Sequence, residues 1–179
     1  MPTIKGAGDV QDNLHTAIIS IGSNLGDKLD NCRRAVDALR ALDHTTVVAC
    51  SRFYKTAPVD YLDQDWFVNA AVKIATRFDA HTLLDALKRI QQRAGRYADV
   101  IRFGPRIIDL DIIFYDETVI DTPDLLIPHP RLHKRRFVLQ PICDIDPAIV
   151  HPILKKDVWA LLERLDDDAQ SVEPICCDC

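Results

Sequence analysis

Hydrophobic and polar positions along the chain follow two patterns, one typical of strands and one of helices. Apolar or β-branched runs predict strands at 17–21, 45–54 and 68–75. Apolar residues at helical spacing predict a helix at 28–42 and a second one that Asp79 caps. The chain therefore begins as an alternation of strands and helices with short connections.

A fourth strand is predicted at 106–114, where β-branched and aromatic residues are concentrated. Its period-two alternation puts Asp109 and Asp111 on one face and places Arg106, Ile108, Leu110, Ile112 and Phe114 on the other. Burying an unpaired charge costs several kcal/mol or more, so the two carboxylates require nearby cations. These cations are either metal ions or arginines.

The order of these elements is βαββαβ, which predicts an α+β fold of the ferredoxin-like type. Two helices would pack on one face of a mainly antiparallel sheet. Beyond the fourth strand we expect a short hairpin partner for it at 118–120 and outer helices at 131–140 and 157–165.

A chain of 179 residues is expected to form one domain. We expect a flexible N-terminal extension at 1–15, a folded domain at 16–168 and a flexible, cysteine-rich tail at 169–179. No apolar run reaches the length of a membrane span, and the first residues lack the apolar core of a signal peptide. We therefore expect a cytoplasmic monomer that does not bind membranes.

The net charge of -5 argues against general nucleic-acid binding. The stretch 88–106 is nevertheless strongly basic, with Asp99 as its single acid. Gly95, Gly104 and Pro105 within it predict a mobile loop next to the strand that carries the aspartates. Arginines on a loop beside aspartates on a strand suit a polyanion bound with a divalent metal, and equally a structural network of ion pairs.

Two other features favour structural interpretations. The turn at 22–28 departs from the Walker pattern of phosphate loops, and we read it as a strand-to-helix turn in which Asn24 or Asp27 caps the helix. The six cysteines divide into three scattered ones, expected to be small buried residues, and three in a tail expected to be a frayed end rather than a metal or redox site.

The stretch 95–112 reads Gly-Arg-x(5)-Arg-Phe-Gly-Pro-Arg-x-x-Asp-Leu-Asp-Ile and closely resembles the signature of the 6-hydroxymethyl-7,8-dihydropterin pyrophosphokinase family. Further motifs of the family occur in the same order: Ile-Gly-Ser-Asn-Leu at 21–25, Phe-Tyr-x-Thr at 53–56, Asn-Ala-Ala-Val at 69–72 and Pro-His at 128–129. The resemblance covers about 16–158 and implies an α/β sandwich.

The resemblance implies a folate-pathway enzyme that transfers diphosphate from ATP to 6-hydroxymethyl-7,8-dihydropterin and releases AMP. It implies two Mg²⁺ ions held by Asp109 and Asp111, and catalytic roles for Arg96 and Arg106. The ATP contacts that it implies are Lys88, Ile112 through its backbone, His129 and Arg135. The pterin contacts that it implies are Thr56, Val59, Phe67, Asn69 and Phe137.

The chain departs from the family pattern at Gln91, where glutamate is common, and at Ala98 and Asp99, where basic residues are common. It also departs at Phe103 and Pro130, where tryptophan and tyrosine are common. The loss of two positive charges from the loop predicts weaker clamping of ATP and leaves the core mechanism in place.

Two other functions compete with this one. One is a non-catalytic ferredoxin-like binding module, against which the full charge set of Arg96, Arg106, Asp109 and Asp111 argues. The other is phosphoryl transfer to a different heteroaromatic alcohol, against which Asn69 argues through the resemblance.

Overall fold

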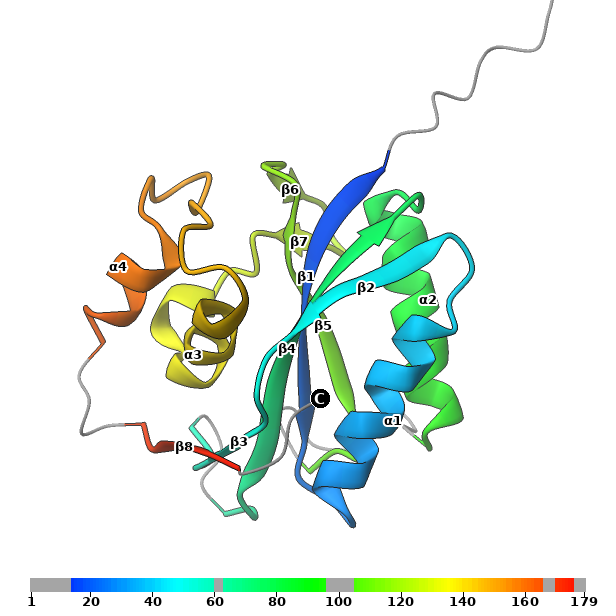
Figure 1. Cartoon of the computed structure of the whole chain (residues 1–179), viewed down its shortest axis with the longest axis vertical. Helices are drawn as coiled ribbons and strands as arrows, with labels where there is room; N and C mark the ends of the chain where they lie inside the picture. The colour runs from blue at the N-terminus through cyan, green and yellow to red at the C-terminus, as the bar shows by residue number, and fades with distance from the viewer. Residues whose placement is uncertain (1–13, 60–62, 96–104, 166–169, 176–179) are drawn as a thin grey trace, which may run out of the picture.

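The structure is a computed structural model that describes residues 14–59, 63–95, 105–165 and 170–175. A sheet forms its centre, with helices on both sides (Figure 1). The predicted α+β class is confirmed.

All strand pairings of the sheet are antiparallel among the described residues, and β1 (His15–Ser23) lies between β5 and β4. The strands follow the order β5-β1-β4-β3-β8, and β2 also pairs with β4. The bounds of the other strands are β2 Thr45–Cys50, β3 Tyr54–Thr56, β4 Phe67–Thr76, β5 Asp109–Tyr115 and β8 Val172–Pro174. The first four predicted strands thus take the arrangement expected of a ferredoxin-like unit.

Helices α1 (Lys28–Arg40) and α2 (Ala80–Arg93) cover one face of the sheet. Each begins where an aspartate accepts from free backbone N–H groups. Asp27 accepts from Asp30 N–H at 3.0 Å, and Asp79 accepts from the N–H groups of residues 81 and 82. The cap of α1 is therefore Asp27, and Asn24 has a different role.

Helices also cover the second face of the sheet. The sequence pattern predicted outer helices but not which face of the sheet they cover. Helix α3 (Arg136–Ile145) packs Val138, Leu139 and Ile142 onto Ile18 and Ala71 of the sheet. Helix α3 begins later than the predicted 131, because residues 132–134 form a short 3-10 turn, η1 (Leu132–Lys134). Helix α4 (Val158–Leu162) lies against α3 and extends this layer.

Two expectations for the fourth strand and its surroundings are wrong. Residues near 120 do not pair with β5: β6 (Ile120–Asp121) pairs with β7 (Leu126–Ile127) in a separate small sheet. Phe114 does not share a face with Ile112, because the register between β1 and β5 shifts at Ile18/Ile19. Phe114 therefore packs in the cluster under α3, and Ile112 packs on the α1–α2 side.

The chain end contains more structure than the sequence pattern suggested. Residues assigned to the flexible tail include β8, which pairs with the edge of β3. Cys32 and Cys143 are free, as expected, whereas Cys50 is disulfide-bonded and its partner is not among the described residues. The three tail cysteines lie outside the described residues.

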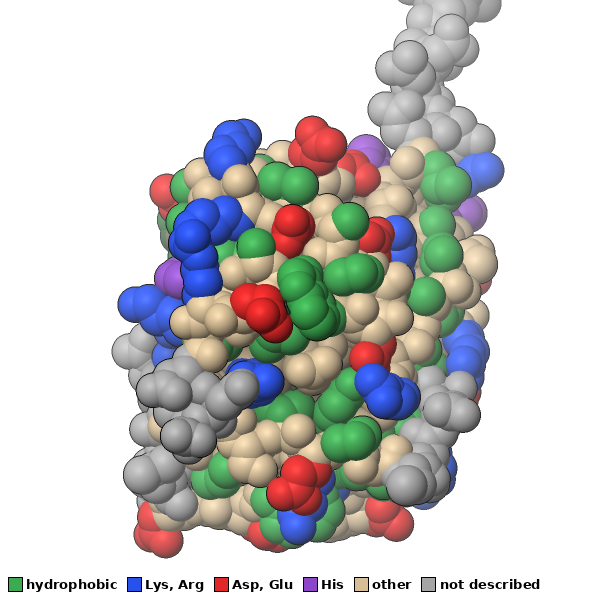
Figure 2. All heavy atoms as spheres, turned by 60° about the vertical axis from the view of Figure 1, so that its left-hand side comes forward, with side chains coloured by type: hydrophobic (Ala, Val, Ile, Leu, Met, Phe, Trp, Pro, Cys, Tyr) green, Lys and Arg blue, Asp and Glu red, His purple; other side chains and the backbone are tan. Residues whose placement is uncertain are grey.

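The face that carries α3 and α4 shows small groups of hydrophobic side chains separated by acidic and basic ones (Figure 2). Within the described ranges, none of the helices combines the length and the hydrophobicity needed to cross a bilayer.

Candidate active site

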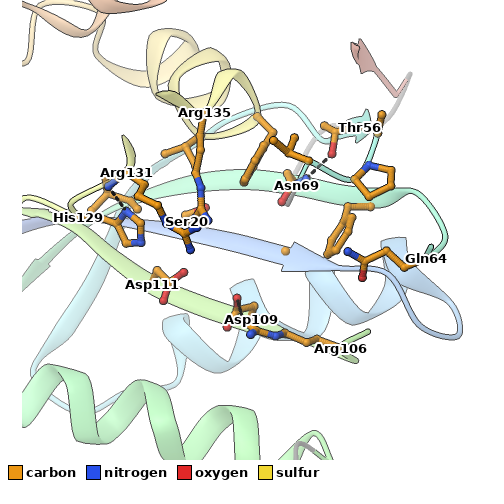
Figure 3. Close-up of a pocket in the computed structure, with 18 residues that line it drawn as sticks. Ser20, Thr56, Gln64, Asn69, Arg106, Asp109, Asp111, His129, Arg131 and Arg135 are labelled. Carbon is orange, nitrogen blue, oxygen red and sulfur yellow. Dashed lines mark hydrogen bonds and ion pairs between the residues drawn. The ribbon is translucent and has the colours of Figure 1, made fainter. Parts of the chain in front are cut away.

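A pocket of about 230 Å³ opens on the α3 side of the sheet, next to the N-terminal end of α3 (Figure 3). It is lined from five segments: β1, β3 with the loop that follows it, β4, the region 106–113, and 129–138. The lining residues are Ser20, Gly22, Thr56, Ala57, Pro58, Val59, Gln64, Phe67, Asn69, Arg106, Asp109, Asp111, Ile113, His129, Arg131, Arg135, Phe137 and Val138.

The acidic side of the pocket comes from β5. Asp109 and Asp111 are two residues apart on this strand, so both side chains face the pocket, as predicted. Arg106 forms an ion pair with Asp109, and the two side chains are only 16% and 22% exposed. The prediction that Arg106 lies on the opposite face from the aspartates is wrong, since Arg106 lines the same pocket. The strand β5 begins only at Asp109, so the alternation of side chains does not extend back to Arg106.

Asn24 fixes the backbone that carries Arg106. Its Oδ1 accepts from Arg106 N–H at 2.7 Å, and its own N–H donates to the Arg106 carbonyl at 3.0 Å. Its Nδ2 donates to Gln64 Oε1 at 2.9 Å, and the residue is 2% exposed. A single buried side chain thus joins the β1–α1 turn to two other segments that line the pocket.

The opposite side of the pocket carries His129, Arg131 and Arg135. His129 is held by its N–H, which donates to the Ile113 carbonyl at 3.1 Å, and its Nδ1 accepts from Arg131 N–H at 3.2 Å. Burial, followed by the charges of Arg135 and Arg131, lowers the pKa of His129 to about 4. The imidazole is therefore neutral at pH 7, while the two arginines make this wall positive.

The remaining part of the pocket is a slot between β3, β4 and α3. Asn69 Nδ2 donates to Thr56 Oγ1 at 2.7 Å, and both residues are buried. Gly22 leaves the space that Asn69 occupies, since a Cβ atom there would lie 2.9 Å from Asn69 Oδ1. Phe67 and Phe137 also line the pocket, together with Val59. The slot combines aromatic walls with one fixed amide, the features that a flat heteroaromatic ligand requires.

The pocket brings together most of the residues that the resemblance singled out, whose roles stay predictions. Arg96 lies outside the described residues, as do Ala98, Asp99 and Phe103. Lys88, on α2, is not among the pocket-lining residues, and neither is Ile112. The Ile112 side chain is buried in the core, so any contact of this residue with a ligand goes through its backbone.

Gln91, a departure from the family pattern, has a structural contact. Its side chain is 6% exposed, and its Oε1 accepts from Leu110 N–H at 3.1 Å on β5. The amide oxygen of glutamine can accept this hydrogen bond, as a carboxylate oxygen of glutamate could. The substitution therefore keeps an acceptor that holds the strand with the two aspartates.

Several lining residues were missed by sequence reasoning. Ser20, Gln64 and Arg131 are polar residues in this group. Ser20 has the same side-chain direction in β1 as Gly22, a period-two signal that was available. No local pattern marks Gln64 or Arg131, because their place in the pocket depends on contacts with distant segments.

The aspartate pair fits a magnesium ion that is bound together with phosphate groups. Mg²⁺ takes oxygen ligands and usually keeps waters and substrate oxygens beside one or two carboxylates. Among the described residues, no group of three or more histidine, cysteine, aspartate or glutamate side chains gathers as a metal site. Two carboxylates would therefore suit a metal that is shared with a ligand, rather than one held by the protein alone.

The family model of 7,8-dihydro-6-hydroxymethylpterin-pyrophosphokinase matches residues 18–147 of the chain. The 2-amino-4-hydroxy-6-hydroxymethyldihydropteridine pyrophosphokinase of Bacillus subtilis is 42% identical over 129 residues, which are 72% of this chain and 77% of that protein. The protein of the same name from Methylorubrum extorquens is 40% identical over 150 residues, which are 84% of this chain and 93% of that protein.

Longer relatives match as well. The folic acid synthesis protein of Schizosaccharomyces pombe is 37% identical over 164 residues, which are 87% of this chain but only 22% of that protein. The mitochondrial folate synthesis bifunctional protein of Arabidopsis thaliana is matched over 24% of its length. The chain thus spans about a fifth to a quarter of the length of these relatives.

Among solved structures, wild-type HPPK-DHPS of Plasmodium falciparum with pterin and p-hydroxybenzoate superposes with a TM-score of 0.69 at 16% identity, covering 87% of this chain and 44% of that one. This likeness concerns the fold. The family model and the bacterial relatives carry the assignment: the chain belongs to the 7,8-dihydro-6-hydroxymethylpterin-pyrophosphokinase family.

Proposed function

We propose that the protein transfers the β,γ-diphosphate of ATP to the hydroxyl of 6-hydroxymethyl-7,8-dihydropterin, giving AMP and the pterin diphosphate in folate biosynthesis. The observation that carries this proposal is the composition of the pocket. One cavity combines three features: an aspartate pair with an arginine, a wall with two more arginines, and an aromatic slot with a buried amide. The names of the bacterial relatives describe the same activity.

The pterin would lie in the slot between β3, β4 and α3. Phe67 and Phe137 would stack on its ring, while Asn69 would pair with its donor and acceptor edge and Thr56 and Val59 would border it. The hydrogen bond from Asn69 to Thr56 holds the amide in one orientation before the ligand arrives. Such preorganisation lowers the entropy lost on binding.

The triphosphate of ATP would lie between the aspartates of β5 and the positive wall. Asp109 and Asp111 would hold two Mg²⁺ ions, which would neutralise charge on the phosphate groups. Arg135 would contact the phosphates as a charged donor, and neutral His129 would contact them through its ring N–H. Lys88 and the backbone of Ile112 would contribute from the far side of β5.

In the proposed reaction, the hydroxymethyl oxygen of the pterin forms a bond to the β-phosphorus of ATP. The bond between that phosphorus and the oxygen bridging to the α-phosphate breaks, and AMP leaves with this oxygen, while the hydroxyl proton passes to solvent. Arg106 and Arg96 would stabilise the charge that develops on the transferred group. Arg106 forms an ion pair with Asp109, so it would exchange this partner for phosphate when ATP binds.

An assay of AMP formation tests this function. Wild-type protein with ATP, the pterin and Mg²⁺ is expected to release AMP, and chelation of the metal with EDTA is expected to stop the reaction. Asp109→Asn and Asp111→Asn are expected to lower the rate at least about a hundredfold, because each removes a metal ligand. Binding of the pterin alone, measured by calorimetry, should persist in both variants and serves as the control for folding.

The result that contradicts the proposal is AMP formation that neither EDTA nor either substitution changes. If the carboxylates serve only as partners of arginines, Asp109→Asn leaves a largely buried Arg106 without its ion pair and destabilises the protein by roughly 3–5 kcal/mol. A sharply lower melting temperature with full turnover would therefore support the structural alternative. The cytoplasmic location and the monomeric state remain predictions.

A further inference from the structure

The segment 170–175 contacts both sides of the slot that we assign to the pterin. It forms β8 beside β3 at one side and reaches the first turn of α3 at the other (Figure 1). Thr56 and Ala57 line the pocket from the first side, and Arg135 and Phe137 line it from the second. A short segment near the chain end therefore connects two walls that are 78–81 residues apart in sequence.

On the first side, β8 makes the outer edge of the strand that carries Thr56. Thr56 lies opposite Val172 in the antiparallel register, and Ala57 N–H donates to the Ser171 carbonyl at 3.3 Å. Ile175 N–H donates to the Phe53 carbonyl at 2.8 Å at the other end of the pairing. Because β3 is only three residues long, this pairing fixes a large part of its backbone.

On the second side, Gln170 completes the N-terminus of α3. The N-cap residue Arg135 supplies no side-chain cap, and Gln170 Oε1 instead accepts from Arg136 N–H at 2.8 Å. Gln170 Nε2 donates to the Lys134 carbonyl at 2.9 Å. The amide thus holds Lys134 and Arg136, which flank Arg135, and Arg136 directly precedes Phe137.

We propose that Gln170, together with β8, is a positioning element that sets the distance between the two walls of the pterin slot. This proposal rests on the proposed function. The Gln170 side chain does not line the pocket itself. It acts through Arg135 and Phe137 on one wall, and β8 acts through Thr56 and Ala57 on the other. Loss of either contact should leave the fold intact and widen the range of slot geometries, so that pterin binding weakens.

Two substitutions remove the two contacts separately. Gln170→Ala removes both hydrogen bonds to α3, and Glu173→Pro breaks the pairing of β8 with β3, since proline has no N–H to donate. Each is expected to raise the KM and the calorimetric Kd for the pterin about three- to tenfold, with kcat changed less than about twofold. Gln170→Glu keeps an oxygen for Arg136 N–H and should lie between wild type and Gln170→Ala.

Glu173→Ala is the matched control. Its side chain is exposed and accepts a hydrogen bond from the Ser171 hydroxyl at 3.3 Å, outside the pocket lining, so pterin affinity should equal that of wild type. If Glu173→Pro fails to fold, Gln170→Ala beside Glu173→Ala still decides the question. A lower melting temperature with unchanged pterin KM and Kd in Gln170→Ala would overturn the proposal and leave the segment a purely structural role.

The wild-type measurements separate this proposal from the proposed function. If wild-type protein binds the pterin and releases AMP, an effect of Gln170→Ala on pterin affinity tests the positioning role alone. Absence of pterin binding and AMP release in wild type would instead contradict the proposed function, and the positioning role with it.

Discussion

At the scale of one residue, Gly22 leaves the space that the Asn69 side chain occupies in the slot proposed for the pterin. It lies opposite Asn69 in the pairing of β1 with β4, and its missing side chain leaves the space next to Asn69 Oδ1. Glycine is required here for close approach, since its φ is not positive. This requirement is invisible in the sequence, where Gly22 reads as the end of an apolar run.

Gly22→Ala is therefore expected to displace the Asn69 amide and to weaken pterin binding by about 1–3 kcal/mol, the cost of an unpaired polar group. ATP binding in the absence of pterin should change little, and titration calorimetry measures both. Gly26→Asn is the control, because Gly26 has a φ of 60° with open space around its Cβ position, and asparagine tolerates this conformation. Unchanged pterin affinity in Gly22→Ala would contradict the role of Gly22 in placing the Asn69 amide.

His129 makes the free energy of unfolding depend on pH. Its folded-state pKa of about 4 lies below the usual 6.5, so the unfolded chain binds a proton on this residue before the folded protein does. The free energy of unfolding should fall as the pH drops from about 6.5 towards 4, by up to about 3 kcal/mol from this residue.

Urea unfolding at pH 7 and at pH 4.5 measures this loss, and His129→Gln should show a smaller loss than wild type. His151 also has a lowered pKa because of burial, so the difference between the two proteins is the informative quantity. An equal loss of stability in both proteins would contradict the assignment to His129.

At the scale of elements, Asn24 joins the turn after β1 to the loop before β4 and to the segment before β5. Asn24→Ala removes the acceptor for Arg106 N–H, so we expect kcat to fall at least about tenfold, because a displaced catalytic group raises the barrier. Asn24→Asp keeps this acceptor and should retain more of kcat, although it loses the donor to Gln64. Equal rates for Ala and Asp variants would contradict the role of the Arg106 contact.

The elements also show where sequence patterns succeed and fail. Asp27 and Asp79 cap α1 and α2, and helical spacing sets the apolar stripes, so these helices were predictable from local chemistry. The run 45–54 reads as one strand but forms β2 and β3, and between them Arg52 binds Asp144 of α3 by its backbone N–H and its guanidinium. A partner 92 residues away leaves no local signal.

At the scale of the whole molecule, the pocket depends on segments that only the fold brings together. Alternation along β5 correctly put Asp109 and Asp111 on one face, because the rule is local. Phe137 and Arg135 reach the slot from a helix on the second face of the sheet, and only the motif resemblance pointed to them. The register shift at Ile18/Ile19 and the pairing of β8 with β3 could not be predicted, because both arise from contacts between distant strands.

In the proposed reaction, the atom attacked is the β-phosphorus of ATP. The most direct test follows radioactive phosphorus placed at the β position of ATP, with wild-type protein, Mg²⁺ and 6-hydroxymethyl-7,8-dihydropterin. We expect the label to move wholly into the pterin product, with one unlabelled AMP released for each pterin diphosphate. Labelled ADP as the product would show transfer of a single phosphoryl group and would contradict this mechanism.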